Sequence, residues 1–169
     1  ERMDIIKWIN RILSWEPNAR IVLHGVSMGA ATVLMASGED LPENVKAVIA
    51  DCGYTSECDE FQREADTLHI PWFPVLNATS VLSKVRDGYD FKQASALAQV
   101  KKSRIPTLFI HGSSDELVPY SMLGELYAAA ACEKEELTVE GAGHALSSSV
   151  APTLYWRTVE DFIAKYLDR

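Results

Sequence analysis

Hydrophobic and polar positions alternate along the chain in blocks that predict helices and strands in turn. Apolar residues recur at helical spacing over residues 4–14 and again over residues 152–167. Short apolar runs rich in β-branched residues predict buried strands at 20–24, 46–50, 106–111 and 136–140. Helix formers predict further helices at 28–37 and 121–132. Strands that alternate with helices predict an α/β fold, a parallel sheet covered by helices.

Residues 54–104 interrupt this alternation. They contain polar and helical pieces, broken by the sequence IPWFP at 70–74, before the next strand begins. An insertion of this length can cover a site, so we expect a helical cap-like insertion within a single domain over residues 1–169. Trp72 and Phe73 could line an acyl pocket there or pack the insertion, and the sequence favours neither interpretation.

Composition narrows the function classes. The 169 residues are 47% hydrophobic and 24% charged, which is typical of one globular domain. The net charge of −8 and the lack of a long basic block argue against a nucleic-acid partner. Three cysteines without metal-ligand spacing predict neither a disulfide framework nor a metal site, and Cys52 has no evident histidine partner. No apolar run approaches the roughly 20 residues of a membrane span.

The sequence GVSMG at 25–29 lies where a predicted strand meets a predicted helix. Ser27 in this turn could cap the helix, or it could be a nucleophile. In the second interpretation the serine backbone is strained, and Gly25 and Gly29 leave room for close approach of neighbouring chain. The backbone N–H of Met28, at the head of the helix, would then point at a developing oxyanion.

Two further residues complete a catalytic pattern with Ser27. Asp115 follows the predicted strand at 106–111, and His144 follows the strand at 136–140 within the sequence GAGHA. The carboxyl ends of parallel strands meet at one edge of a sheet, so we expect these three residues to lie close together. A histidine can remove the serine proton, and a buried carboxylate can orient the histidine. The order Ser, Asp, His after three strands predicts a catalytic triad.

Other residues could compete for these roles. Glu116 and Asp90 are rival carboxylates. His24 and His111 each end a strand, and we expect them to be packed or hydrogen-bonded rather than catalytic. Asp51 also ends a strand and could reach the site, but we expect a loop or helix-capping role for it.

The segments GVSMG, HGSSDELVP and GAGHA resemble the three signature segments of the α/β-hydrolase superfamily, and of its bacterial serine-hydrolase and esterase branch in particular. The resemblance covers nearly the whole chain. It implies Ser27 as nucleophile, Asp115 as the acid and His144 as general base, with no metal or organic cofactor. The sequence DCGYTS at 51–56 is also similar to membrane-anchored hydrolases of Gram-positive bacteria.

The superfamily's sheet normally has eight strands, and this chain resembles only the last four. The loop after the third strand, which donates a second oxyanion-hole N–H, has no counterpart here. The strand at 20–24 would also leave an apolar sheet edge open. We therefore expect an N-terminally incomplete domain, the C-terminal part of a longer enzyme, completed by further chain or by a second copy as a homo-oligomer. Any membrane anchor would lie in the missing N-terminal part.

These observations predict a serine hydrolase that cleaves a small acyl ester through an acyl-enzyme intermediate. A serine peptidase of the acyl-peptide or dipeptidyl peptidase type would use the same triad on a different substrate. A truncated, non-catalytic binding module would keep the fold without the activity. Because the second oxyanion-hole donor has no counterpart, we expect this chain by itself to be weakly active or inactive. Both a cytoplasmic and a membrane-anchored extracellular location stay open.

Overall fold

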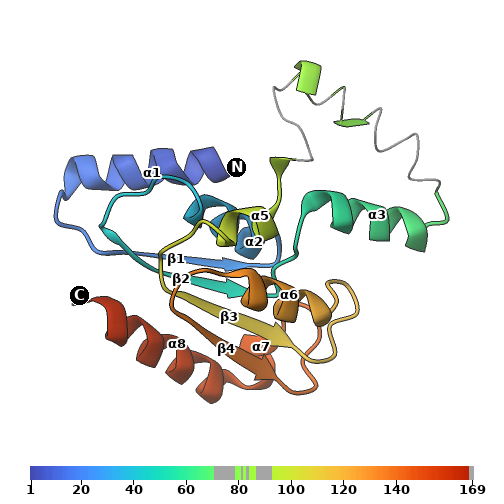
Figure 1. Ribbon diagram of the computed structural model, residues 1–169. Helices are drawn as coiled ribbons and strands as arrows, with labels where there is room; N and C mark the ends of the chain where they lie inside the picture. The colour runs from blue at the N-terminus through green and yellow to red at the C-terminus, as the bar shows by residue number, and fades with distance from the viewer. Residues whose placement is uncertain (71–78, 81, 83, 87–92, 168–169) are drawn as a thin grey trace.

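One parallel sheet forms the centre of the protein. The structure, a computed structural model, describes residues 1–70, 79–80, 82, 84–86 and 93–167 (Figure 1). Its strands are β1 (Ile21–Val26), β2 (Val45–Asp51), β3 (Thr107–Gly112) and β4 (Lys134–Val139), and they lie side by side in sequence order. All three pairings are parallel, so the four carboxyl ends meet at one edge, as the α/β pattern predicted.

Helices cover both faces of this sheet. One face carries α1 (Arg2–Trp15), α2 (Met28–Ser37), α5 (Ala96–Val100) and α6 (Ser121–Ala129). The other face carries α8 (Pro152–Leu167), which α7 (Ser147–Val150) precedes. Helix α2 is mostly apolar, so it can lie buried between the sheet and its neighbouring helices. Eight of its ten residues are buried.

Helix α3 (Glu57–Thr67) differs from the other long helices because none of its residues is buried. It lies beyond the carboxyl ends of the strands (Figure 1), and its first turn is capped by Ser56, whose hydroxyl accepts the N–H of Asp59. A cap over residues 54–104 stays a prediction, and Trp72, Phe73 and Asp90 lie outside the described residues. In the part of the chain that the structure describes, no helix is both long and apolar enough to cross a membrane.

Several elements differ from the sequence predictions. Strand β1 extends to Val26 rather than ending at 24. The last strand begins at Lys134 rather than 136, because its outer end carries three charged residues that hide the apolar signal. Helix α6 ends at Ala129 instead of 132. Helix α7 was not predicted, since its sequence SSSV consists of weak helix formers.

Candidate active site

The turn between β1 and α2 holds Ser27 in a strained conformation. Its φ of 55° and ψ of −120° lie in a region that costs a non-glycine residue roughly 1–3 kcal/mol. Its N–H donates to the carbonyl of Asp51 at 2.8 Å. A Cβ atom at Gly25 would overlap the carbonyl oxygen of Gly29, so strand and helix approach too closely for any side chain there. The expected need for a glycine at position 29 is not seen, because a Cβ there would meet no described atom within 4 Å.

Ser27, His144 and Asp115 form one continuous chain of hydrogen bonds. The Nε2 atom of His144 lies 2.8 Å from the hydroxyl of Ser27, and its Nδ1 atom lies 2.9 Å from Oδ2 of Asp115. The hydroxyl of Ser27 makes no capping bond to α2, so the helix-cap interpretation lacks its defining contact. The structure thus brings together the three residues that the sequence singled out.

Asp115 is held by its own loop. Its Oδ1 atom accepts the N–H groups of Leu117 at 3.0 Å and Val118 at 2.9 Å, which leaves Oδ2 for the histidine. The buried His111 places Nε2 3.0 Å from the carbonyl of Val118 and 3.4 Å from Oδ2 of Asp115. Because a carbonyl only accepts, His111 carries a proton on Nε2 and is hydrogen-bonded as expected. The rival Glu116 is exposed.

The loops that carry Asp115 and His144 are joined to each other by their backbones. The N–H of Ser114 donates to the carbonyl of Ala142 at 3.0 Å, and the N–H of Gly141 donates to the hydroxyl of Ser113 at 2.9 Å. A Cβ atom at Gly112 would overlap the carbonyl oxygen of Ala142. These contacts fix the relative position of the two loops, and only the adjacency of β3 and β4 makes them possible.

Asp51 is the last residue of β2, and its carboxylate does not have the loop or helix-capping role that the sequence favoured. This carboxylate is 1% exposed, and its Oδ1 atom accepts the hydroxyl of Ser147 at 3.1 Å. The hydroxyl of Tyr155 lies 3.0 Å from Nε2 of His24. Burial raises the pKa of the Asp51 carboxyl, although the bond from Ser147 opposes the shift, and burial lowers the pKa of His24. A spacing of 96 residues between Asp51 and Ser147 leaves no local signal for this contact.

Cys52 lies buried next to this site. Among the described residues, its sulfur, a carboxylate oxygen of Asp115 and a ring nitrogen of His144 lie within 4.8 Å of one another. Zinc binds a thiolate, but burial raises the pKa of this thiol to about 12. Asp115 and His144 are also already bonded to each other. The carboxylate and the imidazole are thus committed to each other rather than free as metal ligands.

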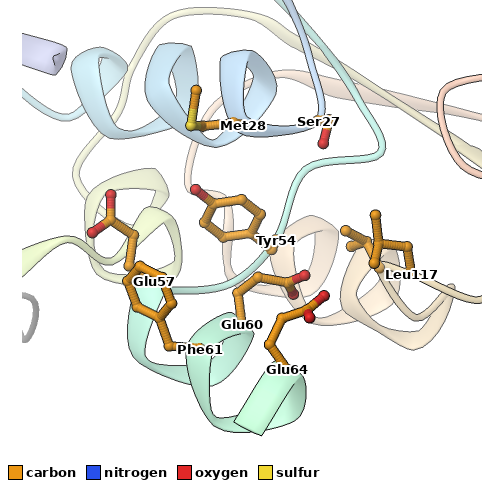
Figure 2. A pocket seen from close by; sticks show the side chains of 9 residues that line it. Ser27, Met28, Tyr54, Glu57, Glu60, Phe61, Glu64 and Leu117 are labelled. Atoms are coloured by element: carbon orange, nitrogen blue, oxygen red, sulfur yellow. The ribbon is translucent and has the colours of Figure 1, made fainter. Parts of the chain in front are cut away.

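A cavity of about 280 Å³ opens beside the hydroxyl of Ser27. Figure 2 shows Tyr54 beneath the Ser27 turn and the carboxylates of Glu60 and Glu64 reaching from α3 toward the same space. The remaining lining residues are Met28, Glu57, Phe61, Leu117 and Val118. Burial raises the pKa of the Glu60 carboxyl. The cavity combines an apolar floor with an acidic wall, and it is large enough for a small substrate group.

The N–H of Met28 belongs to the first turn of α2. The first four N–H groups of a helix have no acceptor within the helix, and the N-terminal end of the helix dipole favours negative charge. This N–H directly follows the strained serine. Its role in stabilising a developing oxyanion stays a prediction.

Four parallel strands, helices on both faces and a serine turn between β1 and α2 define the α/β-hydrolase fold. Within that class the chain belongs to the prolyl oligopeptidase family, whose family model matches residues 2–169. The protein YqkD of Bacillus subtilis is 31% identical over 166 residues, a match that covers 96% of this chain and 54% of YqkD. The chain spans about half the length of the curated relatives it matches.

Two solved structures illustrate the shared fold. An acylaminoacyl peptidase of Pyrococcus horikoshii is 18% identical, with a TM-score of 0.73 over 99% of this chain and 28% of the peptidase. An esterase of Pyrococcus furiosus is also 18% identical, with a TM-score of 0.73 over 98% of this chain and 62% of the esterase. At these identities the likeness shows a common fold.

Proposed function

We propose that this chain is the catalytic part of a serine hydrolase that cleaves an acyl ester. Ser27 is the nucleophile, His144 the general base and Asp115 the residue that orients it. The observation that carries the proposal is the pair of hydrogen bonds, 2.8 Å and 2.9 Å long, that joins the three side chains in this order. The strained backbone of Ser27 and the cavity beside its hydroxyl support the same assignment.

The proposed reaction follows from these contacts. Ser27 attacks the acyl carbonyl while Nε2 of His144 takes the hydroxyl proton, and the N–H of Met28 stabilises the oxyanion. The imidazolium returns its proton to the leaving alcohol, which leaves an acyl-enzyme. Water then attacks this ester with His144 again as base, and the acid product and free Ser27 are released. Asp115 fixes the tautomer of His144 and stabilises its charged form throughout.

A serine peptidase is the second candidate. The family is named after an oligopeptidase, and one structural neighbour is an acylaminoacyl peptidase, whereas another is an esterase. The same triad serves both reactions, and the difference lies in the leaving group, an amine or an alcohol. Comparing kcat/KM on p-nitrophenyl esters with kcat/KM on aminoacyl p-nitroanilides separates the two.

The test of the main proposal is hydrolysis of p-nitrophenyl esters by the purified wild-type protein and by Ser27→Ala. With the second oxyanion-hole donor supplied by further chain, we expect turnover with an initial burst in the wild type, because an acyl-enzyme forms before it is hydrolysed, and loss of at least about 1,000-fold in the variant. A folded wild-type protein that turns over neither esters nor anilides would favour the non-catalytic binding module. Turnover that survives Ser27→Ala would contradict the assignment of the nucleophile.

We also propose that further chain, or a second copy, pairs with β1. In the described residues β1 has a strand neighbour on one side only, and unpaired strand edges invite further pairing. Measuring the mass of the native assembly distinguishes the two sources. A monomer with this edge open in solution would contradict both.

A further inference from the structure

We propose that Asp51 and Ser147 are positioning residues that hold His144 against Ser27. This inference rests on the proposed function, since positioning matters only if His144 acts on Ser27. The two residues lie outside the Ser27–His144–Asp115 chain and contact no reacting atom. They act through the backbone segments that carry the base and the nucleophile.

Asp51 contacts the end of the loop that carries His144. Ser147 follows His144 by three residues, begins α7 and is fully buried. Its hydroxyl donates to Oδ1 of Asp51 at 3.1 Å. This bond fastens the end of the loop to the carboxyl end of β2, next to the strand that carries the nucleophile.

Asp51 also bonds to the backbone of the nucleophile Ser27. Its backbone carbonyl accepts the N–H of Ser27 at 2.8 Å, while its carboxylate accepts the hydroxyl of Ser147. One residue therefore bonds to both sides of the 2.8 Å contact between Ser27 and His144. A shift of either loop away from the other would break a bond to Asp51.

Asp51 is itself fixed in place by the sheet. It is the last residue of β2, where it is paired with Val26 of β1 and Ile110 of β3, and it is 1% exposed. A residue paired on both sides and buried has little freedom to move, so Ser147 is bonded to a fixed anchor.

The local backbone explains why such an anchor is needed. Ala145, between His144 and Ser147, has a φ of 57°, a conformation that is unfavourable for alanine. A loop strained at this point relaxes unless its ends are held. A displacement of about 1 Å at a reacting group can lower a rate by about 100-fold.

The test compares Ser147→Ala with Ser37→Ala. Both remove a buried hydroxyl that makes one hydrogen bond, but Ser37 bonds to the carbonyl of Leu34 at the far end of α2. We expect Ser147→Ala to lower kcat by about 10- to 100-fold with KM within two-fold of the wild type. Ser37→Ala should keep kcat within two-fold.

Two variants of Asp51 sharpen the test. Asp51→Ala should lower kcat as Ser147→Ala does, whereas Asp51→Asn keeps an oxygen acceptor for the Ser147 hydroxyl and should retain kcat within about three-fold. A purely structural role would lower stability in Ser147→Ala and Ser37→Ala alike without separating their kcat values at a temperature where both are folded. A kcat in folded Ser147→Ala within two-fold of the wild type would overturn the proposal.

A second readout keeps failure of this inference distinct from failure of the proposed function. The proton between Nδ1 of His144 and Asp115 should give a downfield ¹H NMR signal in the wild-type protein, whether or not the substrate tried is the right one. We expect Ser147→Ala to weaken or shift this signal and Ser37→Ala to leave it unchanged. An unchanged signal in Ser147→Ala would contradict the positioning role, even if the wild-type protein turns over no substrate. Absence of turnover in the wild-type protein, with the signal present, would count against the proposed function and not against the positioning role.

Discussion

The two halves of the candidate site are built in different ways. The serine half comes from one local turn, in which Gly25 contacts Gly29 only four residues later. The acid–histidine half comes from two loops, in which Gly112 contacts Ala142 thirty positions away. In both halves a glycine lets two backbone segments approach so closely that an added Cβ would overlap a carbonyl oxygen. The close approach in the serine half joins neighbours in the sequence, whereas that in the other half depends on β3 and β4 lying side by side.

The largest expected effect comes from Asp115→Asn, which leaves the acid–histidine half in place but alters its chemistry. An amide favours the wrong tautomer of His144, so we expect kcat to fall about 10,000-fold with the fold intact. The measurement is steady-state ester hydrolysis together with circular dichroism. The exposed neighbour variant Glu116→Gln is the matched control and should lose less than two-fold. A loss below ten-fold in Asp115→Asn would remove Asp115 from the triad.

Alanine at the two close-approach glycines should destabilise the protein by at least about 1–3 kcal/mol each, because backbone atoms must move apart. Gly25→Ala disturbs the serine half, and Gly112→Ala separates the acid and histidine loops. Urea unfolding measures both free energies.

Two other glycines provide the controls for these substitutions. Gly29 and Gly124 lie in helices and have no described atom within 4 Å of an added Cβ, so Gly29→Ala and Gly124→Ala should be neutral or stabilise by up to about 1 kcal/mol. If Gly25→Ala is as stable as Gly29→Ala, the strand and helix are not packed as closely as described.

A smaller effect is expected from the link between the two loops of the acid–histidine half. Ser113→Ala removes the hydroxyl that accepts the N–H of Gly141, and this should lower the free energy of unfolding by about 1 kcal/mol. Ser27→Ala is no control for this link, because it removes the bond between the Ser27 hydroxyl and Nε2 of His144. Thermal unfolding of Ser113→Ala and of the wild type measures the loss, and an unchanged free energy of unfolding would contradict the link between the two loops.

Asp51, which bonds to both halves, should make stability depend on pH. Burial raises the pKa of this carboxyl in the folded protein above its unfolded value, with His24, His111, Tyr155 and Cys52 as its titratable neighbours. The folded state therefore disfavours the charged form, and the resulting loss of stability sets in as pH rises above about 4, through the raised pKa.

The side chain of Asp51→Asn cannot become charged, so this variant is the reference for the measurement. The free energy of unfolding of the wild type relative to Asp51→Asn should fall between pH 4 and pH 7, as urea unfolding at the two pH values would record. If the free energy of unfolding of the wild type rises relative to that of Asp51→Asn as pH rises, the folded state favours the charged carboxylate, which would contradict this prediction.

The contrast between the halves also explains what the sequence could predict. Ser27, Asp115 and His144 were predictable because each follows a strand, and the carboxyl ends of parallel strands share one edge. The strands β1, β2 and β3 were predictable from continuous apolar runs, since both faces of the sheet are covered, whereas β4 shows apolar residues only at its inner end.

The supporting contacts were not predictable for a physical reason. Ser147 meets Asp51 only after α7 packs against the sheet, and the 96 residues between them leave no local signal for the contact. The need for Gly25 but not Gly29 likewise depends on the crossing of β1 and α2, which the motif alone does not specify.

The proposal that His144 activates Ser27 is tested most directly by labelling with a fluorophosphonate probe, followed by mass spectrometry of the labelled peptide. The probe bonds to a serine only when a base activates it, so it reports whether Ser27 and His144 work together. We expect one phosphonate per chain, on Ser27, with labelling abolished in Ser27→Ala and slowed at least about 1,000-fold in His144→Ala. Labelling on another residue, or equal labelling of wild type and Ser27→Ala, would contradict the proposal.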